Sequence, residues 1–331
     1  MKLGTIEISN RYILAPMQNV TTAPYRRFCR KFHEIGLVSI PMIYSKRVIK
    51  DPQFLEYELC KIEEERPISI QLIGSEVDAL KKTIEYLESY EFDVLDINAG
   101  CPSRRAIKAR EGGYLMKDLN LLDKIIHTAS KTCSKPVSMK IRTGFDKPVD
   151  VGKLAEIINN SGINLLSIHA RTVLSKFNDE TLDLDIVKRI KEKVIVPVIG
   201  NGNIINPITA KHFINYTNVD AFMIGRETMG NPNIFNQIHE YLVNNRLISF
   251  KNNREIMETH IKIYENIIDK FLNDVSHPLG NELVKFNELK RNAIWLSKNI
   301  DNSTEIRIQI SKTKNLIQLQ SILNKYFNFH D

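Results

Sequence analysis

The strongest constraint on the fold is an alternation of short apolar runs with amphipathic helical patterns along most of the chain. The runs are rich in Ile, Val and Leu, and they occupy residues 12–15, 37–43, 68–73, 94–98, 137–142, 165–169, 196–200 and 221–225. Strand and helix in strict alternation at this count predict a parallel (β/α)8 TIM barrel rather than an open doubly wound sheet. No Gly-x-Gly-x-x-Gly fingerprint follows the first run, which argues against a dinucleotide-binding sheet.

The rhythm changes after Tyr241. Three segments, residues 254–274, 281–300 and 303–327, carry helical periodicity without convincing strands. The sequence therefore predicts two domains, a barrel over residues 1–241 followed by a small C-terminal all-helical domain over residues 242–331.

One barrel helix is expected within residues 75–90. Ser75 stands where a helix N-cap would lie, and Val77, Leu80, Ile84 and Leu87 fall on one helical face. The outer helices are thus expected to pack an apolar face against the strands.

Composition is that of an ordinary globular protein, with 43% hydrophobic and 26% charged residues in a chain of 331. No apolar run reaches the roughly 18 to 20 residues of a membrane span. Glu7, Asn10 and Arg11 interrupt any secretory signal at the N-terminus. We expect a cytoplasmic protein with no membrane association. The net charge of +7 favours a polyanionic partner, but only weakly.

The four cysteines, Cys29, Cys60, Cys101 and Cys133, stand far apart. No Cys-x-x-Cys pair or nearby histidine at ligand spacing accompanies them, so no metal site is expected. We interpret Cys29, Cys60 and Cys133 as inert reduced thiols.

The C-terminal ends of barrel strands build the active site, and phosphate commonly binds after strands seven and eight. Strand seven ends in Gly-Asn-Gly-Asn and strand eight in a glycine-rich turn, where backbone N–H groups can approach an anion. These turns contain Asn201, Gly202, Asn203, Gly225 and Arg226. The alternative is that the glycines only make tight turns, but two such turns at the two expected positions favour phosphate.

The ends of the other strands are also informative, and most of their residues are polar: Met17 and Gln18, Gln71, Asn98, Lys140 and Arg142, and His169 and Arg171. Amides and cations converging on one mouth suit an aromatic heterocycle with several carbonyls, such as an isoalloxazine ring. Lys140 beside a flavin could stabilise the anionic reduced ring. A salt bridge with Asp96, or a Schiff-base lysine of an aldolase-type barrel, are alternatives for Lys140, and His169 could equally be a core histidine.

Cys101 differs from the other thiols because it follows the fourth strand, on the expected catalytic face, between Gly100 and Pro102. Behind it, Arg104, Arg105, Lys108 and Arg110 could lower a thiol pKa or bind phosphates. An exposed helix face is the alternative explanation for that basic run.

With these residues in place, the chain resembles the tRNA-dihydrouridine synthase family. The matching segments are residues 14–30, 70–76, 96–116, 140–145, 168–172, 198–204 and 223–235. They follow the family order at successive strand ends, and residues 288–300 resemble the family's helical domain less distinctively.

The resemblance implies an enzyme that binds FMN, is reduced by NADPH or NADH, and passes a hydride to C6 of a tRNA uracil while Cys101 protonates C5. It implies that the helical domain grips tRNA. By position, the flavin contacts would be Pro16, Met17, Gln18, Gln71, Lys140, His169, Asn201, Gly202, Asn203, Gly225 and Arg226. Asn98 and Arg171 would orient the uracil, and Arg104 and Arg105 would contact RNA phosphates. A thiol that donates a proton must stay protonated, so we do not interpret these arginines as thiolate activators. We expect a monomer.

The sequence departs from the family pattern locally. The family commonly has Ala-Gly after the Pro-Met pair and Asp before the Pro-Tyr-Arg element, where this chain has Gln18-Asn19 and Thr22. The usual acidic residue after the second strand is absent. The main alternative function is a small-molecule FMN-dependent ene or dihydropyrimidine reductase of the dihydroorotate dehydrogenase type. A non-catalytic RNA-binding protein is a further alternative.

Overall fold

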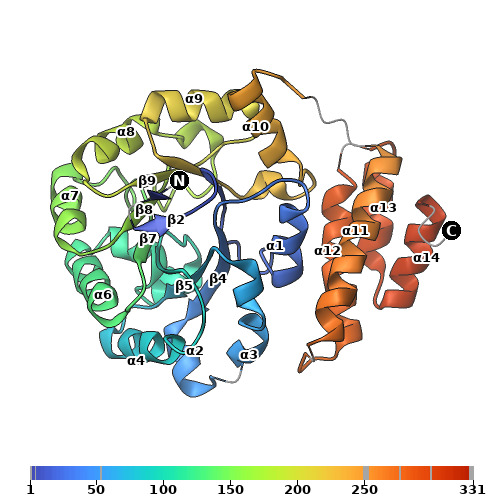
Figure 1. The fold of residues 1–331 in the computed structure, drawn as a ribbon, viewed down its shortest axis with the longest axis horizontal. Helices are drawn as coiled ribbons and strands as arrows, with labels where there is room; N and C mark the ends of the chain where they lie inside the picture. Colours follow the sequence, from blue (N-terminus) through green and yellow to red (C-terminus); the bar gives the residue numbers. More distant parts are fainter. Residues whose placement is uncertain are drawn as a thin grey trace. The chain divides into compact units, whose positions relative to one another are not determined.

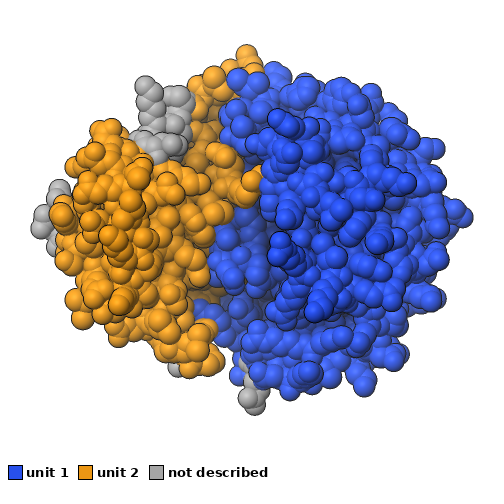
Figure 2. Space-filling model, turned by 180° about the vertical axis from the view of Figure 1, so that it is seen from behind, with its two compact units in different colours: residues 1–22, 34–225 blue, residues 23–33, 226–331 orange. Residues whose placement is uncertain are grey.

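The computed structural model describes residues 2–3, 5–52, 54–248, 253–275, 277–298 and 300–327. Contacts divide the chain into two compact units, one of Met1–Thr22 and Glu34–Gly225, the other of Ala23–His33 and Arg226–Asp331 (Figures 1 and 2). The second unit therefore begins before Tyr241 and also recruits a segment from the N-terminal part of the chain. The roles expected for residues 1–241 and 242–331 remain predictions.

The first unit contains the predicted barrel. Its eight strands are all parallel, in the order β3-β10-β9-β8-β7-β6-β5-β4. A parallel bridge between Ile13 and Leu37 joins the two ends of this sheet and closes it. The strands are β3 (Tyr12–Leu14), β4 (Val38–Tyr44), β5 (Ile68–Ile73), β6 (Val94–Ala99), β7 (Val137–Arg142), β8 (Leu165–His169), β9 (Val198–Asn201) and β10 (Ala221–Ile224).

Helices of the first unit surround the strands (Figure 1). In α4 the expected face is confirmed for Leu80, Ile84 and Leu87, which are buried. Glu76 is the N-cap, however, and Ser75 instead donates a hydrogen bond to the carbonyl of Ala109 at 3.1 Å. The elements are α2 (Ser45–Lys50), α3 (Phe54–Glu58), η1 (Ile62–Glu65), α4 (Val77–Leu87), α5 (Arg104–Lys108), η2 (Gly112–Met116), α6 (Leu119–Thr132), α7 (Val151–Asn160), η3 (Asp179–Thr181), α8 (Leu184–Lys193) and α9 (Pro207–Thr217).

The barrel interior is apolar at one end and polar at the other. A short hairpin, β1 (Lys2–Leu3) with β2 (Ile6–Glu7), brings Ile6 and Ile8 into one buried cluster with Val94, Leu165 and Ile199. Side chains two apart on a strand share a face. Counting two residues at a time toward the C-terminal ends, Val94 is followed by Asp96 and Asn98, Leu165 by Ser167 and His169, and Ile199 by Asn201. The polar side chains therefore lie above the apolar layer, toward the barrel mouth.

The second unit is helical and has an aromatic core. Its elements are α1 (Ala23–Arg30), η4 (Arg226–Thr228), α10 (Ile234–Asn244), α11 (Arg254–Asn273), α12 (Asn281–Leu296), α13 (Ser303–Lys312) and α14 (Leu316–Tyr326). The third predicted helical segment thus forms two helices. The ring of Phe28, from α1, lies 5.0 Å from that of Tyr264 and 6.2 Å from that of His260. Among the described residues, no helix is both long and apolar enough to cross a membrane.

Candidate active site at the mouth of the barrel

A chain of hydrogen bonds crosses β7, β6 and β5 just below the barrel mouth. The Ser138 hydroxyl donates to Asp96 Oδ1 at 2.6 Å, and Gln71 Nε2 donates to Asp96 Oδ2 at 2.6 Å. Asn98 Nδ2 in turn donates to Gln71 Oε1 at 2.8 Å. All four side chains are buried, and strand register pairs Gln71 with Asp96 and Asp96 with Ser138. Because both Asp96 oxygens accept hydrogen bonds, the network fixes the orientation of each amide.

This network ends at the backbone of Cys101. Asn98 Oδ1 accepts hydrogen bonds from the N–H groups of Gly100 at 3.1 Å and Cys101 at 2.9 Å. The loop after β6 is therefore held by a side chain that is itself oriented from below. The expected contact of Asn98 with a uracil remains a prediction, since the structure shows its amide bound within the protein.

Two glycines and a serine, to which the sequence assigns no role, also position Cys101. A Cβ at Gly112 would lie 2.9 Å from the Cys101 Cβ, and one at Gly113 would lie 2.8 Å from the Cys101 carbonyl oxygen. Gly112 has φ of +58°, which favours glycine. The Cys101 thiol is 3.4 Å from the Ser103 hydroxyl, which also caps α5. Cys101 therefore packs against Gly112 and Gly113, and its partly buried thiol donates a hydrogen bond to Ser103.

Lys140 contributes a cation to this mouth. It pairs with Asn98 across the sheet and is half-buried. Burial, together with the nearby charge of Arg142, lowers the pKa of Lys140 to about 8, although Asp96 and Cys101 oppose the shift. Burial likewise raises the pKa of Asp96, against the hydrogen bonds from Ser138 and Gln71. Within the described part of the chain Lys140 Nζ makes no hydrogen bond or ion pair, so the expected alternative of a direct salt bridge with Asp96 is not what the structure shows.

Two buried arginines hold the loops around the mouth. Arg142 donates to the carbonyls of Gly100, Thr172 and Lys176. Arg171 is fully buried, and its guanidinium donates to the Asn178 carbonyl at 2.6 Å, Asp179 Oδ1 at 2.9 Å and Asn203 Oδ1 at 2.8 Å. Arg171 thereby ties the loop after β8 to the loop after β9. Its predicted role in orienting uracil remains a prediction.

The remaining strand-end residues come together through register. His169 pairs with both Arg142 and Asn201 across the sheet, and Asn201 Nδ2 donates to the Met223 carbonyl at 2.7 Å. Gly202 has φ of +133°, so glycine permits the turn after β9. Gly225 ends the first unit beside Met17, whose sulfur would lie 3.3 Å from an added Cβ.

The loop after β3 explains one departure from the family pattern. Pro16 and Met17 are half-buried there, and Gln18 is exposed. Asn19 has φ of +59°, the left-handed region that asparagine tolerates better than most residues. Glycine, the family's usual residue here, also adopts this region without strain, so Asn19 is compatible with the backbone of this loop.

Three predicted basic residues lie at the periphery. Arg104 and Arg105 are exposed on α5, with the Arg105 guanidinium 4.4 Å from the ring centroid of Tyr44. Arg226 is exposed in η4 and begins the second unit, so its predicted pairing with a phosphate at the mouth remains a prediction. Among the described residues, no three His, Cys, Asp or Glu side chains gather as a metal site would require.

A closed parallel barrel with an ordered polar mouth, a loop thiol and a half-buried lysine has the organisation of a (β/α)8-barrel enzyme. The family model described as "Dihydrouridine synthase (Dus)" matches residues 13–328. The chain belongs to the dihydrouridine synthase family.

Individual relatives agree with this assignment. The chain is 30% identical to a probable tRNA-dihydrouridine synthase of Rickettsia prowazekii, over 99% of this chain and 97% of that protein. It is 33% identical to tRNA-dihydrouridine synthase B of Pasteurella multocida, over 71% and 70% of the two chains. Among solved structures, morphinone reductase in complex with tetrahydroNAD aligns with a TM-score of 0.54 at 12% identity, over 75% of this chain and 91% of that one. The last likeness shows the barrel fold.

Proposed function

We propose that this protein is an FMN-dependent tRNA-dihydrouridine synthase, an oxidoreductase that reduces the C5=C6 bond of specific uridines in tRNA with NAD(P)H. The relatives named as such enzymes support the reaction class. The observation that carries the proposal is the placement of Cys101, whose backbone is fixed by Asn98 and whose thiol lies beside Ser103.

The mouth fits a flavin in its chemistry. Lys140 offers a half-buried cation that can stabilise negative charge, and Gln71 has a second amide hydrogen beyond the one given to Asp96. The residues that would hold FMN are Pro16, Met17, Gln18, Gln71, Lys140, His169, Asn201, Gly202, Asn203, Gly225 and Arg226. Bound FMN, once reduced by NAD(P)H, supplies the hydride that C6 of the uracil receives.

Cys101 supplies the proton. In this role its S–H bond breaks as a C–H bond forms at C5, and the thiolate regains a proton from water. A contribution of about 10²- to 10⁴-fold is typical of general acid catalysis. The thiol lies 3.4 Å from a serine hydroxyl that can accept its hydrogen bond, an arrangement that suits the protonated form.

The RNA must deliver an unstacked base to this mouth, at a cost of a few kcal/mol that contacts to its backbone must offset. Arg104 and Arg105, which are exposed on α5 just after Cys101, would contact RNA phosphates. We assign tRNA binding to the helical residues 242–331 and FMN binding to residues 1–241.

The decisive experiment maps dihydrouridine by mass in tRNA from cells that lack the gene. Loss of dihydrouridine at defined positions, restored by the wild-type gene, is expected. Purified enzyme should reduce unmodified tRNA and leave free pyrimidines and enones unreduced. Retention of every dihydrouridine in cells without a paralogue would reject the proposal, and turnover of a free pyrimidine alone would favour the small-molecule reductase.

A further inference from the structure

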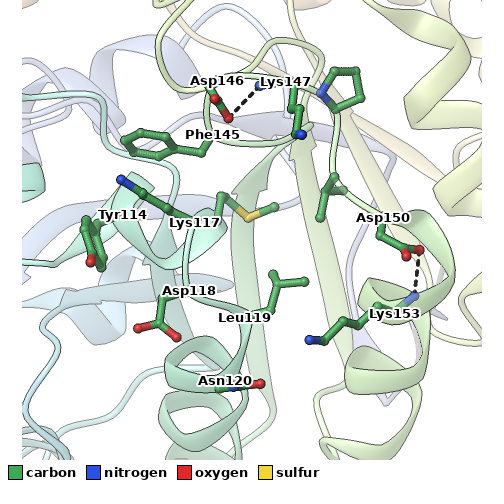
Figure 3. A pocket seen from close by; sticks show the side chains of 13 residues that line it. Tyr114, Lys117, Asp118, Leu119, Asn120, Phe145, Asp146, Lys147, Asp150 and Lys153 are labelled. Atoms are coloured by element: carbon green, nitrogen blue, oxygen red, sulfur yellow. Dashed lines mark hydrogen bonds between the residues drawn. The ribbon is translucent and has the colours of Figure 1, made fainter.

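A pocket of about 470 Å³ lies beside the mouth, between η2 with the start of α6 and the loop from β7 to α7 (Figure 3). Its volume is within the range of ligand sites in proteins. Aromatic and lysine side chains face it from both sides: Tyr114, Lys117, Phe145, Lys147 and Lys153. None of these residues belongs to the site described above.

The pocket adjoins the Cys101 side of the mouth. The helix η2 starts with Gly112 and Gly113, which pack against Cys101, and its next residue, Tyr114, lines the pocket. On the opposite wall Phe145 follows β7 within three residues, and its carbonyl accepts a hydrogen bond from Leu174 at 2.9 Å. A chain segment that enters the mouth can therefore continue into this pocket.

Two aromatic rings lie close together in this pocket. Tyr114 and Phe145 are half-buried, with centroids 6.4 Å apart and planes inclined at 72°. Lys117 Nζ lies 5.5 Å from the Phe145 centroid. Bases of single-stranded RNA stack on such rings, and nearby cations contact their phosphates.

The acidic side chains of the lining are bound locally. Asp146 and Asp150 accept hydrogen bonds from the backbone of Lys147 and Lys153, as Figure 3 shows. Asp118 caps α6 and pairs with Arg110 at 3.0 Å. The three lysines, in contrast, are exposed, and no ion pair of theirs is found within the described residues. They remain available to a ligand.

We propose that this pocket binds a nucleotide adjacent to the target uridine, its base stacked on Phe145 with Tyr114 at the edge of the base, and its phosphate near Lys117, Lys147 and Lys153. The inference rests on the proposed function, since it requires an RNA substrate. Lysines and aspartates balance in the lining, which suits one phosphodiester better than a dinucleotide with several negative charges. The exposed rim also suits one unit of a long chain, because a free small ligand is usually mostly enclosed.

The test is steady-state kinetics of the full-length, flavin-loaded enzyme with unmodified tRNA. Phe145→Leu should raise the KM for tRNA about five- to hundredfold, the range of lost base stacking, while Phe145→Trp retains a low KM. Lys117→Gln should raise this KM and reduce the salt slope of tRNA binding by about 1. The KM for NADPH and the kcat should stay unchanged.

A matched lysine–aromatic pair on α8 and α9 provides the control. Lys188 Nζ lies 5.5 Å from the ring centroid of Tyr216, and Lys188→Gln and Tyr216→Leu should leave the KM for tRNA unchanged. An unchanged KM in both Phe145→Leu and Lys117→Gln overturns the inference. A raised KM for NADPH alone also overturns it and assigns the pocket to the dinucleotide. If wild-type enzyme reduces no tRNA uridine, the proposed function fails first, a result that needs no variant.

Discussion

Each unit of the molecule buries a base, and burial lowers the pKa of both, yet with opposite results at neutral pH. Lys140 at the barrel mouth has its pKa lowered to about 8 and stays mostly protonated. His260 in the helical unit has its pKa lowered to about 4 and is neutral. Asp96 and Cys101 favour the charged form of Lys140. His260 instead packs against aromatic rings, and its ring centroid lies 4.7 Å from that of Phe32. Lys140 therefore stays charged at the mouth despite its burial, whereas His260 is uncharged in the helical core.

The two bases affect stability over different pH ranges. In both cases the folded pKa is below the unfolded one, so the unfolded state binds more protons in between. The contribution of Lys140 destabilises the folded state fully below about pH 8, where its buried amine is charged. This destabilisation disappears as the pH rises from about 8 to 10.5. For His260 stability is full above about pH 6.5 and is lost as the pH falls toward 4.

The largest effect is expected from a comparison of Cys101 at the barrel mouth with a buried cysteine of the helical unit. Cys101→Ala should lower uridine reduction about 10²- to 10⁴-fold, because the proposed C5 proton donor is lost, while reduction of the proposed flavin by NADPH should persist. Stopped-flow measurement of each half-reaction checks this. The control is Cys29→Ala, since Cys29 is buried in the helical unit, where burial raises its pKa to about 12. It should keep full turnover; equal losses in both variants would contradict the assigned role.

Substitution of Lys140 is expected to have the next largest effect on turnover. Lys140→Met should lower kcat about 10²- to 10³-fold, the usual effect of removing one electrostatic donor. It should also raise the urea midpoint of the apoprotein at pH 7, where the lysine is buried with its charge. Turnover of wild-type enzyme should fall as the pH rises above about 8 and Lys140 loses its proton. A variant with normal turnover would remove Lys140 from the chemistry.

For His260 we predict a smaller effect, on the free energy of unfolding and not on activity. Below pH 6.5 the wild type should lose about 2–3 kcal/mol of unfolding free energy from His260 by pH 4, from the size of its pKa shift. His260→Leu should remove that share and leave tRNA reduction at pH 7.5 unchanged. Urea unfolding at several pH values between 4 and 7.5 measures both slopes. Parallel slopes in the two proteins would show that His260 does not titrate in this way.

The smallest predicted effect concerns the network below Cys101. Asp96→Asn replaces one acceptor by a donor, so Gln71 and Asn98 lose their fixed orientation, at a cost of about 1–2 kcal/mol. We expect about a tenfold lower kcat with a nearly unchanged KM for tRNA. Ser138→Ala removes only one hydrogen bond and should cost less. An effect of Ser138→Ala as large as that of Asp96→Asn would contradict a network centred on the carboxylate.

The barrel could be predicted from sequence because its strands are buried on both faces and read as apolar runs. The runs at residues 68–73, 137–142 and 165–169 coincide with β5, β7 and β8. The hairpin β1–β2 has two residues in each strand, too few for a period to emerge. Helix α1 has a clear apolar face, but no local pattern says that Phe28 packs with Tyr264, far along the chain.

The sequence predicts which strand-end side chains lie near one another better than it predicts their hydrogen bonds. Parallel register brings strand ends together, so Gln71, Asn98 and Lys140 could be expected at one mouth. Hydrogen-bond partners depend on the path of the loops. The sequence therefore did not reveal that Asn98 holds the Cys101 backbone, or that Gly112 leaves room for the thiol-bearing residue.

The β1–β2 hairpin covers the apolar end of the barrel interior. Ile6 and Ile8 are buried with Val94 and Leu165 at the end opposite the mouth. Among the described residues, this apolar layer fills the interior below Asn98 and Lys140. We therefore expect a ligand of these two side chains to approach from the C-terminal ends of the strands.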